Sequence, residues 1–476
     1  MRHDRSHAKI IATLGPSCDD KRILEQMVHE GIDVVRLNFS HGDHEEHLKR
    51  IQMVLEINEE LNSNVALLAD LQGPKLRVGV MENNGVMLEE GQIFILTTEK
   101  CIGTAEKAFI SYDLLPKDVK RGDIILIDDG KLQLEALESD GKKTVKTKVL
   151  VGGILSSKKG VNLPSTKVSK PSLTEKDIED AKFALSHDVD WLALSFVRKA
   201  QDIFDLKKLI ADSGKNASVI AKIEKPEALE EIDEIIEASD AIMVARGDLG
   251  VEVEFQKVPL IQKKIVNKCI NMSKPVIIAT QMMESMITNA TPTRAEANDV
   301  ANAVLDGADT LMLSGETSVG KYPMETIRNM QKVIDSTEFR GFHFFRKHPP
   351  KIQNETFLQD SVCYNAVVMA EQAEASAIIC LTNSGYTAYR ISSHRPRANI
   401  FTFTMNNELL RKMSLVWGVR AYYFADCQNI NDYVDYSIDF LLSQNLIRKK
   451  DLVVHVGSIP VYKKGKTNLI KLSRID

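Results

Sequence analysis

The chain has 476 residues, of which 43% are hydrophobic and 27% charged, a composition typical of soluble globular proteins. Its length exceeds what one hydrophobic core usually supports, so we expect two or three domains. The net charge of -5 argues against nucleic-acid and membrane-surface binding, and no apolar run is long enough to cross a bilayer.

Six cysteines are scattered through the sequence without a CxxC pair. This usage indicates free thiols in a reducing compartment. The first five residues are charged and lead directly toward a strand, a pattern without the features of a signal peptide. We therefore expect a cytoplasmic protein.

The first 72 residues alternate between strand and helix patterns. Apolar strands are predicted at 9–14, 34–39 and 65–71. The first helix is predicted to be capped by Ser17, and the second by a capping box of Asp43 and Glu46. This alternation indicates a parallel sheet with crossover helices.

The same rhythm resumes near residue 172, where Thr174 and Asp177 are predicted to cap a helix. Five further apolar strands follow, near 189–196, 219–224, 241–246, 275–280 and 309–314. Four strands are preceded by an aspartate, namely Asp33, Asp190, Asp240 and Asp309. Eight buried parallel strands predict a closed (β/α)8 TIM barrel built from residues 1–72 and 166–342.

Two further segments differ from the barrel in their predicted secondary-structure pattern. Residues 73–165 contain recurrent turn signals between short β-type runs, which predicts an inserted small β-barrel domain placed to act as a lid. Residues 355–476 combine a helical stretch at 357–373 with strands at 377–381, 400–403 and 452–456. We expect a separate C-terminal α/β domain there.

Polar side chains collect where the barrel strands end, which in this fold usually indicates catalysis. They are Arg36, Asn38, Ser40, Asp70, Lys222, Glu224, Arg246, Gly247, Asp248, Thr280, Ser314 and Glu316. Lys222 and Glu224 are expected on one face of their strand, because side chains alternate. This set contains cations that can bind an anion, carboxylates that can hold a divalent metal, and hydroxyls that can transfer protons. Together these groups suit phosphoryl transfer.

The C-terminal domain offers a second candidate site. Six residues join a strand to a helix with hydroxyls, a glycine and free amides: Thr382, Asn383, Ser384, Gly385, Tyr386 and Thr387. Such a segment can form a phosphate-binding nest, or it can be an ordinary helix cap.

Four segments resemble the strongest signatures of the pyruvate kinase family. They are Ile242–Gly250, Ala279–Met286, Pro292–Glu296 and Leu313–Thr317, and Val35–His41 is similar as well. The resemblance spans nearly the whole chain. It implies transfer of the phosphoryl group of phosphoenolpyruvate to ADP, with Mg2+ or Mn2+ as cofactor.

The resemblance also implies a role for each residue at the strand ends. Glu224 and Asp248 would hold the metal, Lys222 and Arg36 would neutralise the transferring group, and Gly247, Asp248 and Thr280 would bind substrate. Thr280 would lie near the enolate carbon that is protonated. The ADP phosphates would be faced by Asn38, His41, Arg77 and Lys159.

The sequence departs from the commonest family pattern at the monovalent-cation region, which comprises Asn38, Ser40, Asp70 and Lys75. Leu71 stands where many members have a threonine, and Lys75 stands where they have a glutamate. Members that resemble this version do not need K+. A tethered ammonium can replace a bound cation, so we expect K+-independent activity.

The segment from Thr382 to Thr387 matches the family's loop for a sugar phosphate. An arginine that some members place against a second phosphate is replaced near Ser437, while the loop 460–466 remains basic. This departure favours a sugar monophosphate as activator over fructose 1,6-bisphosphate. The resemblance further implies a homotetramer.

Two other functions fit parts of the sequence. A metal-dependent lyase or aldolase could use Lys222 as a Schiff-base amine on the same barrel. A metabolite sensor could keep only the C-terminal phosphate pocket, but it would have no need for Lys222, Glu224, Asp248 and Thr280.

Overall fold

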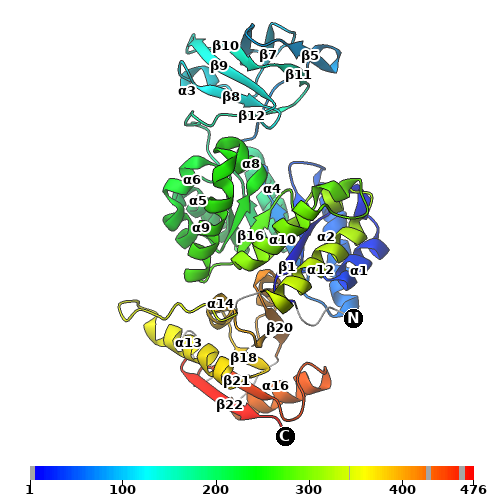
Figure 1. Ribbon diagram of the computed structural model, residues 1–476, viewed down its shortest axis with the longest axis vertical. Helices are drawn as coiled ribbons and strands as arrows, with labels where there is room; N and C mark the ends of the chain where they lie inside the picture. The colour runs from blue at the N-terminus through cyan, green and yellow to red at the C-terminus, as the bar shows by residue number, and fades with distance from the viewer. Residues whose placement is uncertain (1–5, 342–343, 425–429, 460–466) are drawn as a thin grey trace.

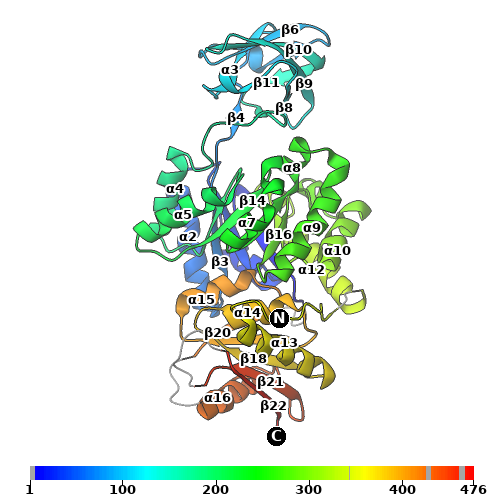
Figure 2. The same ribbon diagram turned by 90° about the vertical axis from the view of Figure 1, so that its left-hand side faces the viewer.

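The protein consists of three parts stacked along its longest axis, as the computed structural model shows (Figure 1). The structure describes residues 6–341, 344–424, 430–459 and 467–476. The barrel lies in the middle, with the all-β insertion above it and the C-terminal domain below (Figure 2). No helix in these described ranges has the length and apolar character needed to span a membrane.

The central part is a closed barrel of eight parallel strands, which confirms the predicted fold class. Its strands are β1 (Lys9–Thr13), β2 (Val34–Asn38), β3 (Ala66–Asp70), β13 (Trp191–Leu194), β14 (Ser218–Ile223), β15 (Ala241–Ala245), β16 (Val276–Ala279) and β17 (Thr310–Leu313). The barrel closes because β1 pairs with both β2 and β17. All carboxyl ends of the strands therefore meet at one mouth, where the candidate site residues were predicted.

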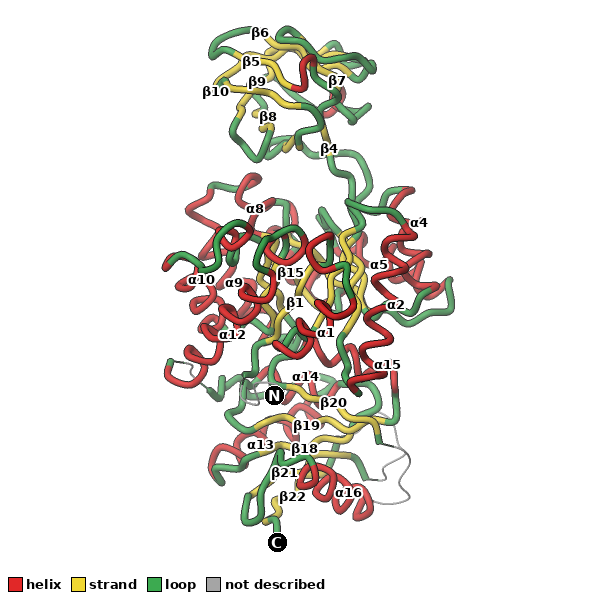
Figure 3. The backbone as a smooth tube through the Cα atoms, turned by 90° about the vertical axis from the view of Figure 1, so that its right-hand side faces the viewer, coloured by secondary structure: helices red, strands yellow, loops and turns green. Residues whose placement is uncertain are grey.

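Helices surround the barrel on its outside (Figure 3). They are α1 (Lys21–Glu30), α2 (His44–Leu61), α4 (Glu175–Ser186), α5 (Ala200–Asp212), α6 (Pro226–Glu230), α7 (Ile232–Ala238), α8 (Arg246–Glu252), α9 (Val258–Asn271), α10 (Arg294–Asp306), α11 (Gly315–Ser318) and α12 (Pro323–Arg340). Short 3-10 turns are η1 (Pro16–Cys18), η3 (Phe255–Lys257) and η4 (Glu284–Ile287).

Of the three helix caps predicted above, one is right, one is incomplete and one is wrong. Capping boxes form at Thr174 and Thr293. The cap of α1 is Asp20, because Ser17 is taken up in the preceding 3-10 turn. Asp43 accepts a hydrogen bond from the backbone of Glu46 at 3.0 Å, but no reciprocal bond from Glu46 completes a box.

The four aspartates that precede barrel strands share one function. Each accepts a hydrogen bond from a backbone N–H of a barrel strand, and each carboxylate thereby fixes the amino-terminal end of that strand. The pairs are Asp33 with Ile10 (3.1 Å), Asp190 with Leu67 (2.8 Å), Asp240 with Val219 (2.8 Å) and Asp309 with Val276 (3.0 Å). The sequence repeat is therefore a structural device of the barrel floor.

The insertion forms a seven-stranded sheet in the order β4-β12-β8-β9-β10-β6-β7 and a two-stranded sheet of β11 and β5. Its elements are β4 (Leu76–Arg77), η2 (Glu82–Asn84), β5 (Gly85–Leu88), β6 (Ile93–Thr97), β7 (Lys107–Phe109), α3 (Leu115–Asp118), β8 (Ile124–Ile127), β9 (Leu132–Ser139), β10 (Thr144–Val151), β11 (Gly153–Ser156) and β12 (Gly160–Asn162). It has its own hydrophobic core. We call this insertion the lid.

The C-terminal part is a five-stranded sheet in the order β20-β19-β18-β21-β22, with β22 antiparallel. Its elements are α13 (Phe357–Gln372), β18 (Ala377–Leu381), α14 (Tyr386–Ser393), β19 (Asn399–Thr404), α15 (Asn407–Lys412), η5 (Met413–Leu415), β20 (Val419–Tyr423), α16 (Ile430–Ser443), β21 (Leu452–Gly457) and β22 (Leu469–Arg474). Leu415 joins the cluster of buried residues inside the barrel, so this domain closes the barrel floor.

Candidate active site at the barrel mouth

Lys222 stands at the centre of the polar cluster. It is the fifth residue of β14, and its ammonium lies 3.0 Å from Glu224 Oε1 and 3.1 Å from Asp70 Oδ1. The same nitrogen donates a hydrogen bond to Ser195 Oγ at 2.6 Å. The strand alternation that placed Lys222 and Glu224 on one face therefore describes a real contact. The side chain is buried, so the charge is fixed in place before any ligand arrives.

The neighbouring carboxylates keep Lys222 protonated and positively charged. Burial alone would lower its pKa, but the carboxylates of Asp70 and Glu224 outweigh that effect and hold the pKa well above the ordinary value. A Schiff-base lysine must instead present a neutral amine at working pH. This electrostatic setting therefore disfavours the lyase or aldolase alternative.

Asp70 joins two cations from neighbouring strands. Arg36 on β2 donates from Nε to Asp70 Oδ2 at 2.7 Å, and its other end donates to Thr13 Oγ1 at 3.0 Å. Burial would raise the pKa of Asp70, but Lys222 and Arg36 together hold it below its usual range. Asp70 is thus ionised and orients two positive groups at the mouth.

Glu224 and Asp248 supply the carboxylates of the predicted metal site. Glu224 accepts a hydrogen bond from the backbone of Phe196 at 2.9 Å, and burial followed by the charge of Asp248 raises its pKa despite the presence of Lys222. Mg2+ is commonly held by one or two carboxylates with the remaining positions left to water and substrate oxygens. The donor set fits such an ion. No cluster of three or more metal-binding His, Cys, Asp or Glu side chains occurs in the described part of the chain.

Thr280 and Gly247 meet where the neighbouring strands β16 and β15 end. Gly247 N donates to Thr280 Oγ1 at 2.8 Å, and that hydroxyl donates to Ala279 O at 2.6 Å. Thr280 has a φ of 69°, which is unusual for a β-branched residue. Arg246 holds this turn, because it donates to Thr280 O at 2.7 Å and pairs with Asp299 at 2.7 Å. Local strain of this kind concentrates at functional sites.

Cations from the barrel and the lid hinge gather at the rim. Partial burial, then the charges of Arg77, Lys75 and Arg36, lowers the pKa of His41. Arg77 lies on β4 and donates to Lys158 O at 3.2 Å. Arg77, Lys75 and Arg36 therefore lie within electrostatic range of His41.

Three other rim residues have partners of their own. Asn38 Oδ1 accepts a hydrogen bond from Ser40 N at 3.1 Å, which closes the turn after β2. Lys159 lies on the lid and pairs with Asp128 at 2.9 Å. Its ammonium is therefore held against the lid in this structure.

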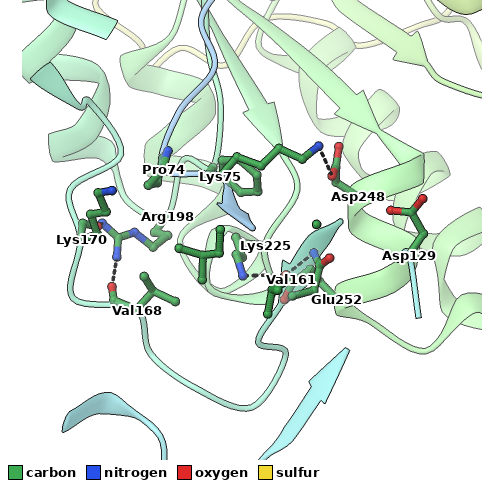
Figure 4. A pocket seen from close by; sticks show the side chains of 14 residues that line it. Pro74, Lys75, Asp129, Val161, Val168, Lys170, Arg198, Lys225, Asp248 and Glu252 are labelled. Atoms are coloured by element: carbon green, nitrogen blue, oxygen red, sulfur yellow. Dashed lines mark hydrogen bonds and ion pairs between the residues drawn. The ribbon is translucent and has the colours of Figure 1, made fainter. Parts of the chain in front are cut away.

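The ammonium of Lys75 lies 3.9 Å from Asp248 Oδ1 (Figure 4). The ion-pair partners of Asp70 are Arg36 and Lys222 instead. The structure thus puts the tethered charge of Lys75 next to the predicted metal ligand Asp248.

Sequence reasoning missed three residues that complete this site. Ser195 receives the hydrogen bond of Lys222 and donates to Leu71 O at 2.7 Å; Phe196 supplies the backbone N–H for Glu224; Thr13 supports Arg36. Ser195 directly follows β13, so the rule applied to the other strands would have found it. By contrast, Glu316 accepts bonds from Met283 N and Ser314 N and serves the local backbone.

The predicted effector segment lies at the start of α14. Thr382 Oγ1 accepts from Gly385 N at 3.1 Å, and Thr387 Oγ1 lies 2.7 Å from Thr467 Oγ1. Asn383, Ser384 and Tyr386 line a cavity of about 640 Å³ between this domain and the barrel floor.

Two further sequence predictions concern the surroundings of this segment. Ser437 is buried and donates to Val434 O within α16. The basic loop at 460–466 lies outside the described residues.

Comparisons with known proteins agree with this architecture. The family model described as "Pyruvate kinase, barrel domain" matches residues 5–327, and "Pyruvate kinase, alpha/beta domain" matches residues 360–473. A pyruvate kinase of Geobacillus stearothermophilus is 41% identical over 98% of this chain and 79% of its own length. One from Staphylococcus aureus is 38% identical over 98% of this chain and 80% of its own. The crystal structure of a Cryptosporidium parvum pyruvate kinase superposes with a TM-score of 0.92, at 35% identity over 99% of this chain and 97% of the other.

Proposed function

The chain belongs to the pyruvate kinase family, and on that premise we propose how its residues divide the work of phosphoryl transfer. In the family reaction, the phosphorus–oxygen bond of phosphoenolpyruvate breaks, a bond to a terminal oxygen of ADP forms, and the enolate takes a proton at carbon. The observation that carries the assignment is the buried ammonium of Lys222 between Asp70 and Glu224.

Lys222 and Arg36 are the residues that neutralise the transferring phosphoryl group. Both are oriented by Asp70, so little reorganisation is needed when the charge moves between the two oxygens. Glu224 and Asp248 would hold Mg2+ or Mn2+, which supplies Lewis-acid charge stabilisation when bound.

The backbone at Gly247 and Asp248, together with Thr280, binds the substrate. The hydroxyl of Thr280 is held by Gly247 N and Ala279 O, beside the turn that Arg246 fixes. We assign this hydroxyl to the side of the enolate where the proton is delivered.

The nucleotide binds between the rim and the lid. Asn38, His41, Arg77 and Lys159 face its phosphates in this proposal. The positive charges of Arg77, Lys75 and Arg36, all within electrostatic range of His41, support it, since several cations suit a polyanionic ligand. Lys159 would exchange its ion pair with Asp128 for phosphate when the lid closes.

The enzyme is proposed to work without K+. The positive charge of Lys75, 3.9 Å from Asp248, supplies a tethered cation within the site. The region that would otherwise receive K+ already contains the two cations that balance Asp70.

The remaining assignments concern regulation and assembly. Thr382, Asn383, Ser384, Gly385, Tyr386 and Thr387 are proposed to bind an activating sugar monophosphate, and the cavity that three of them line is wide enough for a small ligand. A homotetramer and a cytoplasmic location complete the proposal. The five free cysteines among the described residues accord with that location.

A coupled assay for pyruvate tests these points in one experiment. The purified enzyme is given phosphoenolpyruvate, ADP and Mg2+ in tetramethylammonium buffer, with and without K+ and with a panel of sugar phosphates. We expect full activity without K+ and activation by a monophosphate. Strong stimulation by K+ would refute the first assignment, and activation by fructose 1,6-bisphosphate alone would refute the second. Borohydride with pyruvate should leave Lys222 unlabelled; covalent trapping would restore the lyase alternative.

A further inference from the structure

A second ion pair is buried behind the active site, where the lid meets the barrel. Lys225 donates from Nζ to Glu252 Oε1 at 2.7 Å, and Asn162 donates from Nδ2 to the same oxygen at 2.8 Å. Lys225 and Glu252 belong to the barrel, whereas Asn162 is the last residue of lid strand β12. We call these three residues the hinge triad.

The hinge triad is placed at the return connection from the lid to the barrel. Lys225 and Glu252 line the cavity that also contains Lys75 and Asp248 (Figure 4). Glu252 is 4% exposed, and its second oxygen, Oε2, is buried without a hydrogen-bond partner. A buried carboxylate with one unsatisfied oxygen is costly, so it depends strongly on the two donors it retains.

Each barrel member of the hinge triad is a chain neighbour of a proposed metal ligand. Lys225 directly follows Glu224. Glu252 follows Asp248 by four residues on α8, which is about one helical turn. A displacement of Glu252 therefore moves the turn of helix that carries Asp248, and a displacement of Lys225 moves the backbone of Glu224.

The lid member is equally well placed. Asn162 pairs with Leu126 of β8 inside the lid sheet, so Asn162 moves together with that sheet. Lys159, proposed to contact ADP, lies three residues earlier in the chain. One hydrogen bond thus connects the nucleotide-facing edge of the lid with the two segments that bear the metal ligands.

We propose that the hinge triad is a positioning device that sets the lid strand β12 relative to Glu224 and Asp248. Asn162 is the pivot about which the lid rotates, and the Lys225–Glu252 ion pair keeps the side chain of Asn162 in place through its hydrogen bond to Glu252. The inference rests on the assignment of Glu224 and Asp248 as metal ligands. We assign none of the three residues to substrate or metal, so all three act as positioning residues.

The test begins with Asn162→Ala, which cuts the lid connection and leaves the Lys225–Glu252 pair intact. We expect kcat about tenfold lower and a raised KM for ADP, with the KM for phosphoenolpyruvate changed less than about twofold. Gln92→Ala is the matched control, because Gln92 makes comparable amide bonds within the lid only. Equal losses in both variants would overturn the proposal.

A second variant separates positioning from stability. Lys225→Met with Glu252→Leu replaces the buried pair by apolar side chains, a change that often preserves stability. We expect normal thermal unfolding, the same loss of kcat as Asn162→Ala, and no further loss when Asn162→Ala is added. Wild-type turnover in the double variant, or additive losses in the triple variant, would overturn the proposal.

Hydrogen exchange gives a readout that is independent of turnover. Amides of residues 163–170 should exchange faster in Asn162→Ala than in Gln92→Ala, with no ligand present. Unchanged exchange would contradict the proposal. Mn2+ binding to Glu224→Gln tests the ligand assignment separately: normal binding there would reject the metal site, while the exchange result would still decide whether the hinge triad fixes the lid.

Discussion

Replacing Lys222 by methionine tests the central feature of the site. The ammonium has three partners within 3.1 Å, namely Asp70, Glu224 and Ser195. A unit charge about 4 Å from the phosphoryl group is worth about 4 kcal/mol at an effective dielectric constant of 20. About 2.7 kcal/mol already corresponds to a hundredfold change in rate, so we expect turnover of Lys222→Met to fall by about a hundredfold or more.

The assay is pyruvate formation at saturating substrates and Mg2+, with thermal unfolding and Mn2+ binding measured in parallel. Removal of a buried partner is expected to cost about 3–5 kcal/mol of stability, so the variant must be assayed below its melting temperature. Mn2+ binding should be no weaker than in the wild type, because the ammonium beside Glu224 opposes a second cation. Lys215→Met, which removes an exposed pair with Asp188, is the matched control. Near-normal phosphoryl transfer in folded Lys222→Met would refute the reasoning.

Three further predictions follow from neighbouring residues. Asp70→Asn should lower the unfolding free energy by about 3 kcal/mol at pH 7, measured by urea unfolding at a series of pH values. Because the native pKa of Asp70 lies below 3.8, this loss of stability should persist down to about pH 4 and vanish as the pH falls through the native pKa. Thr280→Ser, which keeps the hydroxyl, should retain turnover within about threefold, whereas Thr280→Ala should lose about tenfold or more; equal kinetics of the two would remove the hydroxyl from the mechanism. Leu71→Thr combined with Lys75→Glu should make activity in tetramethylammonium buffer rise at least about threefold on adding K+, and an unchanged response would contradict the tethered-cation account.

Much of the barrel could be predicted from the sequence because its strands are nearly continuous apolar runs. The strand alternation that paired Lys222 with Glu224 needed no knowledge of the fold. The partnership of Lys222 with Asp70 was beyond that reasoning, since the two lie on β14 and β3, which are not adjacent in the closed barrel. They meet because β13 pairs with both strands and the barrel wall curves around the mouth.

Each feature that the sequence did not give has its own physical cause. Asp20 rather than Ser17 caps α1, because a 3-10 turn at Pro16–Cys18 precedes the helix and moves the cap three residues along the chain. Ser195 was overlooked although it directly follows β13, as the predicted residues follow their own strands. The pairing of Lys75 with Asp248 depends on the direction in which the chain leaves the barrel for the lid, and neither periodicity nor propensity encodes that direction.

Two of the aspartates at the barrel floor also bind arginines of the C-terminal domain. Asp190 accepts hydrogen bonds from Arg411 of α15 at 2.9 and 3.0 Å, and from Leu67 on β3, the strand that ends in Asp70. Asp309 likewise links Arg395 at 2.8 Å to β16, the strand that precedes Thr280. Because close-packed interiors transmit strain, and hydrogen-bonded rigid elements carry energetic coupling, any shift of the C-terminal domain has two direct routes to the mouth. Cutting one route with Arg411→Met should therefore alter a response to a C-terminal ligand more than it alters turnover without that ligand.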